Sequence, residues 1–303
     1  MIKSMTTENF SELTIIRRKP QTASLSQWQI AWRTLRRNPV AMLALIGLIL
    51  LAGITLLAPW LAPYDPTLLD YDHLLESPSA AHLWGTDDLG RDIFSRVLWG
   101  GRESLRVSFF GVILAMVGGI LVGLVSGFYG GMVDLLIQRI VDIFLAFPSI
   151  LLVLSIVAAL GPNLGTVLIA LGISSIPGYS RLVRGSVLSA RNFEYVTAAR
   201  VVGATNRRIM LRHILPNIIA PIIIYSTLGL GHAITITAGL SYIGLGAQPP
   251  SPEWGAMLNY GRNFMRTAWW MSAFPGAAIF IAVLCVNLLG DGLRDALDPK
   301  MRI

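Results

Sequence analysis

The chain has 303 residues, of which 54 % are hydrophobic and only 14 % are charged, and its formal net charge is +7. Soluble domains carry about 25 % charged residues, so a soluble fold of this size could not cover so much apolar surface. A lipid bilayer accepts apolar side chains, and the composition therefore indicates an integral membrane protein. The basic residues flank apolar runs and form no nucleic-acid-binding motif, so we expect membrane lipid and no nucleic acid as a partner.

Residues 1–39 form a polar, basic segment that we expect to be cytoplasmic, because its length does not suit a cleaved signal peptide. Near its end, Trp28, Ala31, Trp32 and Leu35 recur at helical spacing beside basic residues. This pattern predicts an amphipathic helix that lies in the membrane interface or contacts a soluble partner. Residues 40–62 are then long and apolar enough for a retained first transmembrane helix.

A polar loop follows at residues 63–104, and we expect it to be external. Two interpretations stay open for Asp87, Asp88 and Asp92. In the first they contact an external protein, and in the second they are ordinary solvated loop charges. Five further apolar runs complete about six predicted spans of an all-α, polytopic membrane protein. These runs are residues 105–129, 140–160 with Pro148 as a kink, 164–179, 218–240 and 269–289.

The basic residues lie mainly before the first span and between the fourth and fifth spans. Cytoplasmic loops carry the excess of Lys and Arg, so both termini and the loop between spans four and five are expected in the cytoplasm. The core domain then covers residues 105–292, and residues 293–303 form a cytoplasmic tail.

Few polar residues interrupt the spans. Asp142 has Arg139 three residues before it on the same helix face, so an interfacial ion pair, which Asp134 can join, explains it as well as a transport role does. For His232 we favour a packing role over a ligand role, and we expect Asn287 to form a hydrogen bond between helices.

The sequence carries no catalytic pattern. No lysine follows a glycine, which excludes a Walker A loop, and the single Cys285 lies in an apolar run. The four histidines are scattered without paired-ligand spacing. They are His73, His82, His213 and His232. We therefore expect no enzymatic activity, no metal site and no cofactor in this chain.

The loop between the fourth and fifth spans, residues 190–216, predicts a helix, a break and a second helix. Residues 196–202 are a helical run with small side chains, Gly203 permits a sharp turn, and Pro216 begins the next span. Two short helices joined in this way would make a projecting knob suited to a groove on a partner. The alternative is a solvated basic loop.

This loop resembles the EAA motif of ABC-importer permeases, in which EAA is followed by Gly and then by Leu-Pro. The matching residues, with their neighbours in the predicted coupling segment, are Glu194, Thr197, Ala198, Ala199, Arg200, Gly203, Ala204, Leu215 and Pro216. Thr197 replaces the first Glu of the motif, a role that Glu194 could take one turn earlier, and His213 stands where an apolar residue is usual.

Five other segments resemble the dipeptide/oligopeptide/nickel family of ABC-importer permeases. They are residues 85–96, 139–142, 244–250, 253–257 and 287–299, and the resemblance covers roughly residues 26–300. It implies the type I ABC importer permease fold, with this chain as the C-type subunit of a bacterial inner-membrane importer of small peptides or glutathione. The implied partners are a second permease, two ATPases that bind the ATP and dock on the loop, and an external solute-binding protein.

Two alternatives remain at this point. The same architecture could import nickel or metal chelates, because the binding protein sets much of the selectivity. An ATP-independent secondary transporter would need more buried ionisable groups in the spans than the sequence offers.

Overall fold

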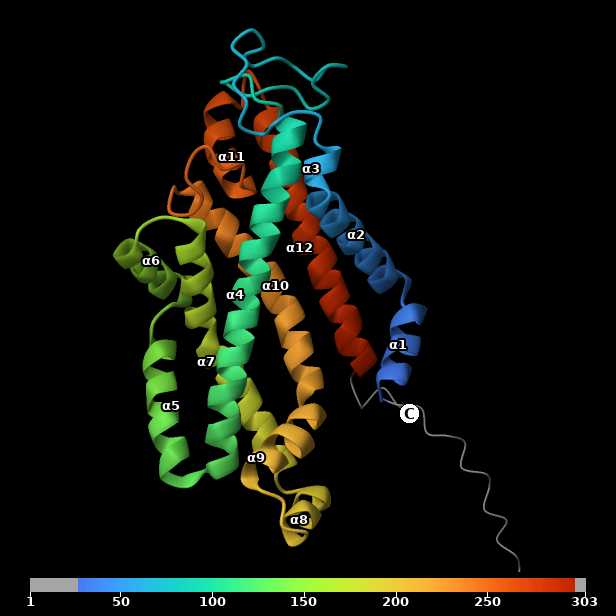
Figure 1. Cartoon of the computed structure of the whole chain (residues 1–303), viewed down its shortest axis with the longest axis vertical. Coiled ribbons are helices and arrows are strands. Elements are labelled where there is room, and N and C mark those ends of the chain that lie inside the picture. The colour runs from blue at the N-terminus through green and yellow to red at the C-terminus, as the bar shows by residue number, and fades with distance from the viewer. Residues whose placement is uncertain (1–26, 298–303) are drawn as a thin grey trace, which may run out of the picture.

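The computed structural model describes residues 27–297, and every regular element within them is a helix (Figure 1). The all-α class is therefore confirmed, whereas the expectations for residues 1–26 and 298–303 lie outside the described residues. Figure 1 shows long helices running between two ends of the molecule. We call the end formed by residues 62–92 the loop end, and the end formed by helix α8 (Glu194–Val201) the α8 end.

Five helices in the described range are long and apolar enough to cross a membrane, and a bent pair of helices makes a sixth if it counts as one span. The five are α2 (Pro39–Leu56), α4 (Ile93–Tyr129), α7 (Leu164–Ala190), α10 (Ile219–Tyr242) and α12 (Trp270–Leu297). The predicted number of about six spans is thus confirmed.

The third span was predicted to be one helix with a kink at Pro148, and this prediction is wrong. The chain instead forms α5 (Gly131–Ala146) and α6 (Ser149–Leu160), which meet at an angle of 88°. Phe147 and Pro148, between them, both have extended backbone dihedral angles. A residue before proline disfavours the helical conformation, and proline has no N–H for the preceding helix, so the break falls at this dipeptide.

The second predicted span starts twelve residues too late, because α4 begins at Ile93 and the loop ends at Asp92. With 37 residues α4 is about 55 Å long, which exceeds the bilayer core of about 30 Å. Hydropathy locates only the apolar part of such a helix. The side chain of Asp92 accepts a hydrogen bond from the N–H of Ser95 at 2.7 Å and so caps the helix.

Helices α4 and α7 pack closely along one seam of glycines on α4. A Cβ at Gly119 would lie 2.1 Å from the Cβ of Tyr179, and one at Gly123 would lie 2.5 Å from the carbonyl oxygen of Ser180. Glycine is therefore required for this approach of the two backbones, as is common between membrane helices.

The amphipathic helix predicted for residues 28–37 is confirmed as α1 (Gln27–Arg37). Ala31 and Leu35 are buried against Ala41 and Ala296, so α1 packs on α2 and α12, whereas Trp32 is exposed. The first span also ends earlier than predicted, since α2 stops at Leu56 and a short helix, α3 (Ala58–Leu61), follows it.

The sequence interpretation missed helix α11 (Trp254–Gly261) and the 3-10 turn Arg262–Phe264 that follows it. Both lie at the loop end (Figure 1). The carboxylate of Glu253 caps α11 by accepting the N–H of Ala256 at 3.0 Å, and it also accepts the Ser104 hydroxyl of α4 at 2.8 Å. Glu253 is completely buried, so it fastens α11 to α4.

Candidate functional site

The α8 end begins with a short capped helix. Glu194 lies in the first turn of α8, where a negative charge is favourable, and Arg200 lies in the last turn. Gly203 follows with φ of +80°, its N–H donating to the carbonyl of Arg200 at 2.9 Å. Glycine after a helix in this left-handed conformation is a common helix stop. The predicted turn at Gly203 is thus confirmed.

The second helical part is less regular than predicted. Thr205 caps α9 (Asn206–Arg208), which continues as a π-helix over Ile209–Ile214 and a 3-10 turn over Leu215–Asn217. Pro216 lies in that turn, so α10 begins at Ile219 and the prediction that Pro216 begins the next span is wrong. Ala204 is half-buried at the start of this segment.

One face of the α8 end is firmly packed. Val196 and Ala199 of α8 and Ile209 and Ile214 of the π-helix are all buried. They share one apolar cluster with residues of α4 and α7, which include Leu124, Phe128, Val183 and Val187. A displacement of α8 would therefore press directly on two of the long helices.

The opposite face is open and apolar at its tip. Val201 and Val202 are each 82 % exposed, and Thr197, Ala198 and Arg200 beside them are exposed as well. Isolated exposed apolar residues are ordinary, but two adjacent valines at the end of a projecting helix suit a contact with another chain. The sequence interpretation did not select them, although a valine pair directly before the glycine break was a visible signal.

A cavity of about 260 Å³ lies between α4, α7 and α10, and its lining includes Tyr179, Tyr225 and His232. The two tyrosine rings meet edge to face with centroids 4.7 Å apart. His232 is exposed on the cavity side, so the packing role that we favoured for it is wrong.

Asn287 is exposed on α12 and no hydrogen bond of its side chain is found within residues 27–297, contrary to expectation. It is a packing neighbour of α10 instead, since a Cβ at Gly231 would lie 2.7 Å from its Oδ1. A glycine at position 231 thus permits the close approach of α10 and α12.

The ionic residues near the third span pair with α7 and not with each other. Asp142 accepts a hydrogen bond from Arg181 at 2.6 Å, and Asp134 binds two nitrogens of Arg184 at 2.6 Å each. The predicted partner of Asp142, Arg139, is therefore wrong. The helical spacing identified a neighbour on the same face, but α7 lies closer to these carboxylates.

At the loop end the acidic residues are used internally. Asp87 accepts Arg91 Nε at 2.7 Å and lies 3.6 Å from Arg96, and all three side chains are buried. Asp92 is 3 % exposed, whereas Asp88 is half-buried. Both interpretations of Asp87 and Asp92, contact with an external protein and solvated charge, are therefore wrong. The sequence could not show this, because the burial of these pairs depends on how the loop folds onto the start of α4.

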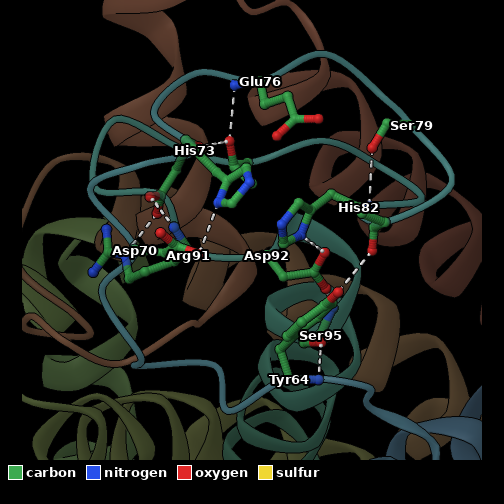
Figure 2. Close-up of polar contacts among 12 residues, drawn as sticks. Tyr64, Asp70, His73, Glu76, Ser79, His82, Arg91, Asp92 and Ser95 are labelled. Carbon is green, nitrogen blue, oxygen red and sulfur yellow. Dashed lines mark hydrogen bonds and ion pairs between the residues drawn. The ribbon is translucent and has the colours of Figure 1, made fainter.

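Two of the supposedly scattered histidines meet at the loop end (Figure 2). His73 Nδ1 lies 2.9 Å from Asp70, and the buried His82 lies with Nδ1 3.1 Å from Asp92. The hydrogen bond to Asp70 raises the pKa of the exposed His73 imidazole above its ordinary value. The expectation that no histidines pair is wrong for these two.

Comparisons with known proteins agree with this architecture. Residues 119–303 match the family of binding-protein-dependent transport system inner membrane components, and residues 26–78 match the N-terminal transmembrane domain of oligopeptide transport permease C. The dipeptide transport system permease protein DppC of Alkalihalophilus pseudofirmus is 48 % identical over 282 residues, 93 % of each chain. The glutathione transport system permease protein GsiD of Escherichia coli O157:H7 is 49 % identical over 276 residues, 91 % of each chain.

Among solved structures, an inward facing conformation of the MetNI methionine ABC transporter has a TM-score of 0.53 at 20 % identity. The match covers 73 % of this chain and 99 % of that chain, and it supports the permease fold alone. The family match extends over more than half of the sequence and the relatives over nearly all of it. The chain therefore belongs to the binding-protein-dependent transport system inner membrane components and is a multi-pass permease subunit of an ABC importer, a class that works with ATPase and substrate-binding partners.

Proposed function

We propose that this permease carries small peptides, of the dipeptide, oligopeptide or glutathione kind, across the bacterial cytoplasmic membrane. The names of its relatives support the substrate class, since they describe dipeptide and glutathione transport. The driving force comes from separate ATPase subunits, which bind the ATP, so this chain needs no cofactor of its own.

The ATPases dock on the α8 end, and the exposed Val201–Val202 tip is the single observation that carries this proposal. An exposed apolar tip on a projecting helix is suited to bind in a groove on the surface of a partner protein. Of the predicted coupling residues, Glu194, Thr197 and Ala198 lie on the exposed side, whereas Ala199 is buried and anchors the helix to the bundle.

Closure of the ATPase pair would push α8 toward the bundle. The buried apolar cluster would transmit this displacement of α8 to α4 and α7. The irregular segment that contains Leu215 and Pro216 would transmit it to α10. Those three helices line the cavity that holds Tyr179 and His232. The coupling therefore ends at the surfaces that peptides would pass as the pathway changes between outward and inward openings.

A second homologous permease completes the pathway by covering the open side of the cavity. The basic residues that flank α8 are expected to face the cytoplasm, with both chain termini on that side and the loop end outside. In that orientation the loop end faces the solute-binding protein.

The test uses the importer with both permeases, the ATPases and the binding protein, purified in mild detergent and reconstituted. Val202→Asp is expected to remove co-purification of the ATPase and ATP-dependent peptide uptake, because a charge at the tip would have to be desolvated on docking. The matched control is Leu83→Asp, a charge at an apolar residue that is 55 % exposed in the loop end, and it should keep the ATPase bound.

Full ATPase recovery with Val202→Asp would contradict docking at this tip. Competition of labelled dipeptide uptake by glutathione and by Ni²⁺ then tests the cargo. ATP-dependent uptake of Ni²⁺ with no uptake of labelled dipeptide would replace the peptide proposal.

A further inference from the structure

The loop end brings together three side chains that can bind a metal ion, and no role in transport has been given to them. Asp70, His73 and His82 each offer a ligand atom within 4.8 Å of the others. The centroids of the two imidazole rings are 5.6 Å apart. Figure 2 shows the rings beside each other, with Asp70 and Asp92 at their Nδ1 atoms.

The ring of His82 is oriented by a carboxylate that fixes its tautomer. An ionised carboxylate only accepts hydrogen bonds, so Nδ1 of His82 donates to Asp92 and leaves the Nε2 lone pair free. His73 differs, because its Nδ1 lies 2.9 Å from Asp70 Oδ2 and these two atoms would bind the ion together in place of their hydrogen bond. A histidine whose second nitrogen donates to a carboxylate is the usual arrangement of a metal-binding histidine in proteins.

The His82–Asp92 pair is prearranged, because both side chains are buried, at 6 % and 1 % exposure. Asp92 is held in turn by the N–H of Ser95 at the start of α4. On the other side His73 is 48 % exposed and can move, while its backbone carbonyl is fixed by the Thr86 hydroxyl. One fixed ligand and one adjustable ligand permit closure around an ion.

The charge around the two rings favours a cation. Asp70, Asp72 and Glu76 all act electrostatically on His73, and Asp92 lies behind His82. The guanidinium of Arg91 forms an ion pair with Asp87 at 2.7 Å. The negative charge at the rings is therefore not neutralised by this arginine.

We propose that Asp70, His73 and His82 bind one divalent transition-metal ion of the Zn²⁺ type, with water as a further ligand. Two imidazoles and one carboxylate are a typical zinc ligand set, whereas Mg²⁺ and Ca²⁺ prefer oxygen ligands alone. Metal bonds of about 2.0–2.2 Å place the ligand atoms of a tetrahedral site roughly 3.4 Å apart. The three ligand atoms of Asp70, His73 and His82 must therefore move closer together by about 1–2 Å. Rotation of the exposed His73 ring supplies this movement.

The bound ion would be a resident of the permease and not its cargo. It would join residues 70–73 to His82, and through Asp92 to the first turn of α4. This role goes beyond the proposed peptide transport and does not depend on it.

The test measures zinc binding by the full-length permease, purified without a histidine tag and stripped with EDTA. Zn²⁺ is titrated in competition with a chromophoric chelator. We expect one Zn²⁺ per chain, at least about tenfold weaker binding for His73→Ala and Asp70→Asn, and no change with added Mg²⁺. His73→Ala is the main variant because this side chain is exposed and its loss should not disturb folding.

His213→Ala is the matched control, since it removes a histidine at the α8 end, outside the cluster. It should bind Zn²⁺ like the wild type. Co²⁺ offers a second measurement, because its visible absorption band reports four-coordinate geometry, and this band should be present in the wild type and lost in His73→Ala. Equal zinc affinity of His73→Ala and wild type, or no stoichiometric zinc in the wild type, would overturn the proposal.

Discussion

The two ends of this permease use their side chains in opposite ways. At the loop end the charged residues Asp87, Arg91 and Arg96 are buried and paired with one another. At the α8 end two apolar residues, Val201 and Val202, are exposed. Residue type alone therefore does not identify an exposed surface, because an acidic loop can be an internal scaffold while a valine pair lies exposed at the tip of a helix.

The largest effect should come from Gly203→Pro. Proline fixes φ near −65° and lacks the N–H, whereas Gly203 has φ of +80° and donates to Arg200. A penalty of about 3 kcal/mol or more against the native turn should reduce ATP-driven uptake at least about 100-fold while the chain still inserts. Proteoliposome uptake measures this.

Gly203→Asn is the control, because asparagine tolerates the left-handed conformation and should retain most uptake. Normal transport by the proline variant would show that the turn does not couple α8 to the bundle.

A stability loss of about 3–5 kcal/mol is expected for Asp87→Asn at the loop end. The substitution removes a buried carboxylate that pairs with Arg91 and Arg96, and it leaves two buried guanidinium groups uncompensated. Thermal unfolding in detergent measures the change. Asp88→Asn, at the half-buried neighbour, should cost less than about 1 kcal/mol. Equal losses for both variants would argue that the loop end is not an internal charge scaffold.

A pH-dependent effect is expected at Glu253, because burial raises the pKa of this carboxyl above its ordinary value of 4.5. The folded protein then holds the proton to higher pH than the unfolded chain. This contribution to stability is fully present below pH 4.5 and is lost as the pH rises through the raised pKa.

Glu253→Gln mimics the protonated side chain, so its Tm should match the wild type in acid and exceed it by at least about 2 °C at higher pH. A Tm difference that does not change with pH would count against a raised pKa at Glu253.

The smallest effect should come from Asp142→Asn. The Asp142–Arg181 pair is about half exposed, and exposed ion pairs contribute roughly 0–1 kcal/mol. Asp134→Asn should cost more, about 1–3 kcal/mol, since Arg184 binds Asp134 through two nitrogens in a less exposed place. Unfolding and uptake of both variants test this order. Loss of uptake with Asp142→Asn in a folded chain would restore the transport role of Asp142.

The sequence alone could predict the spans, since long apolar runs depend only on local composition, and it could predict the turn at Gly203. It could not predict the start of α4, because residues 93–104 are helical for packing reasons and not for hydropathy. It also missed the meeting of His73 and His82. They lie nine positions apart, and the hydrogen bonds that fold the loop back, in which the Thr86 hydroxyl donates to His73 and accepts from Glu76, are tertiary contacts.

The same limit explains the errors at α5 and α7. Helical spacing assigned Arg139 to Asp142, whereas the true partner Arg181 lies on another helix, 39 residues later. The α5–α6 break was visible as Pro148, but the angle depends on how both segments pack on α7.

Helix α4 links the loop end and the α8 end. Its first turn contains Arg96 of the buried ion pairs, and its last turns lie beside α8. Its 37 residues contain no proline, so it can act as a single lever of about 55 Å. A tilt of about 5° about one end would move the other end by roughly 5 Å, about one helical turn. A small angular change of α4 at the α8 end would thus become a displacement of about one helical turn at the loop end.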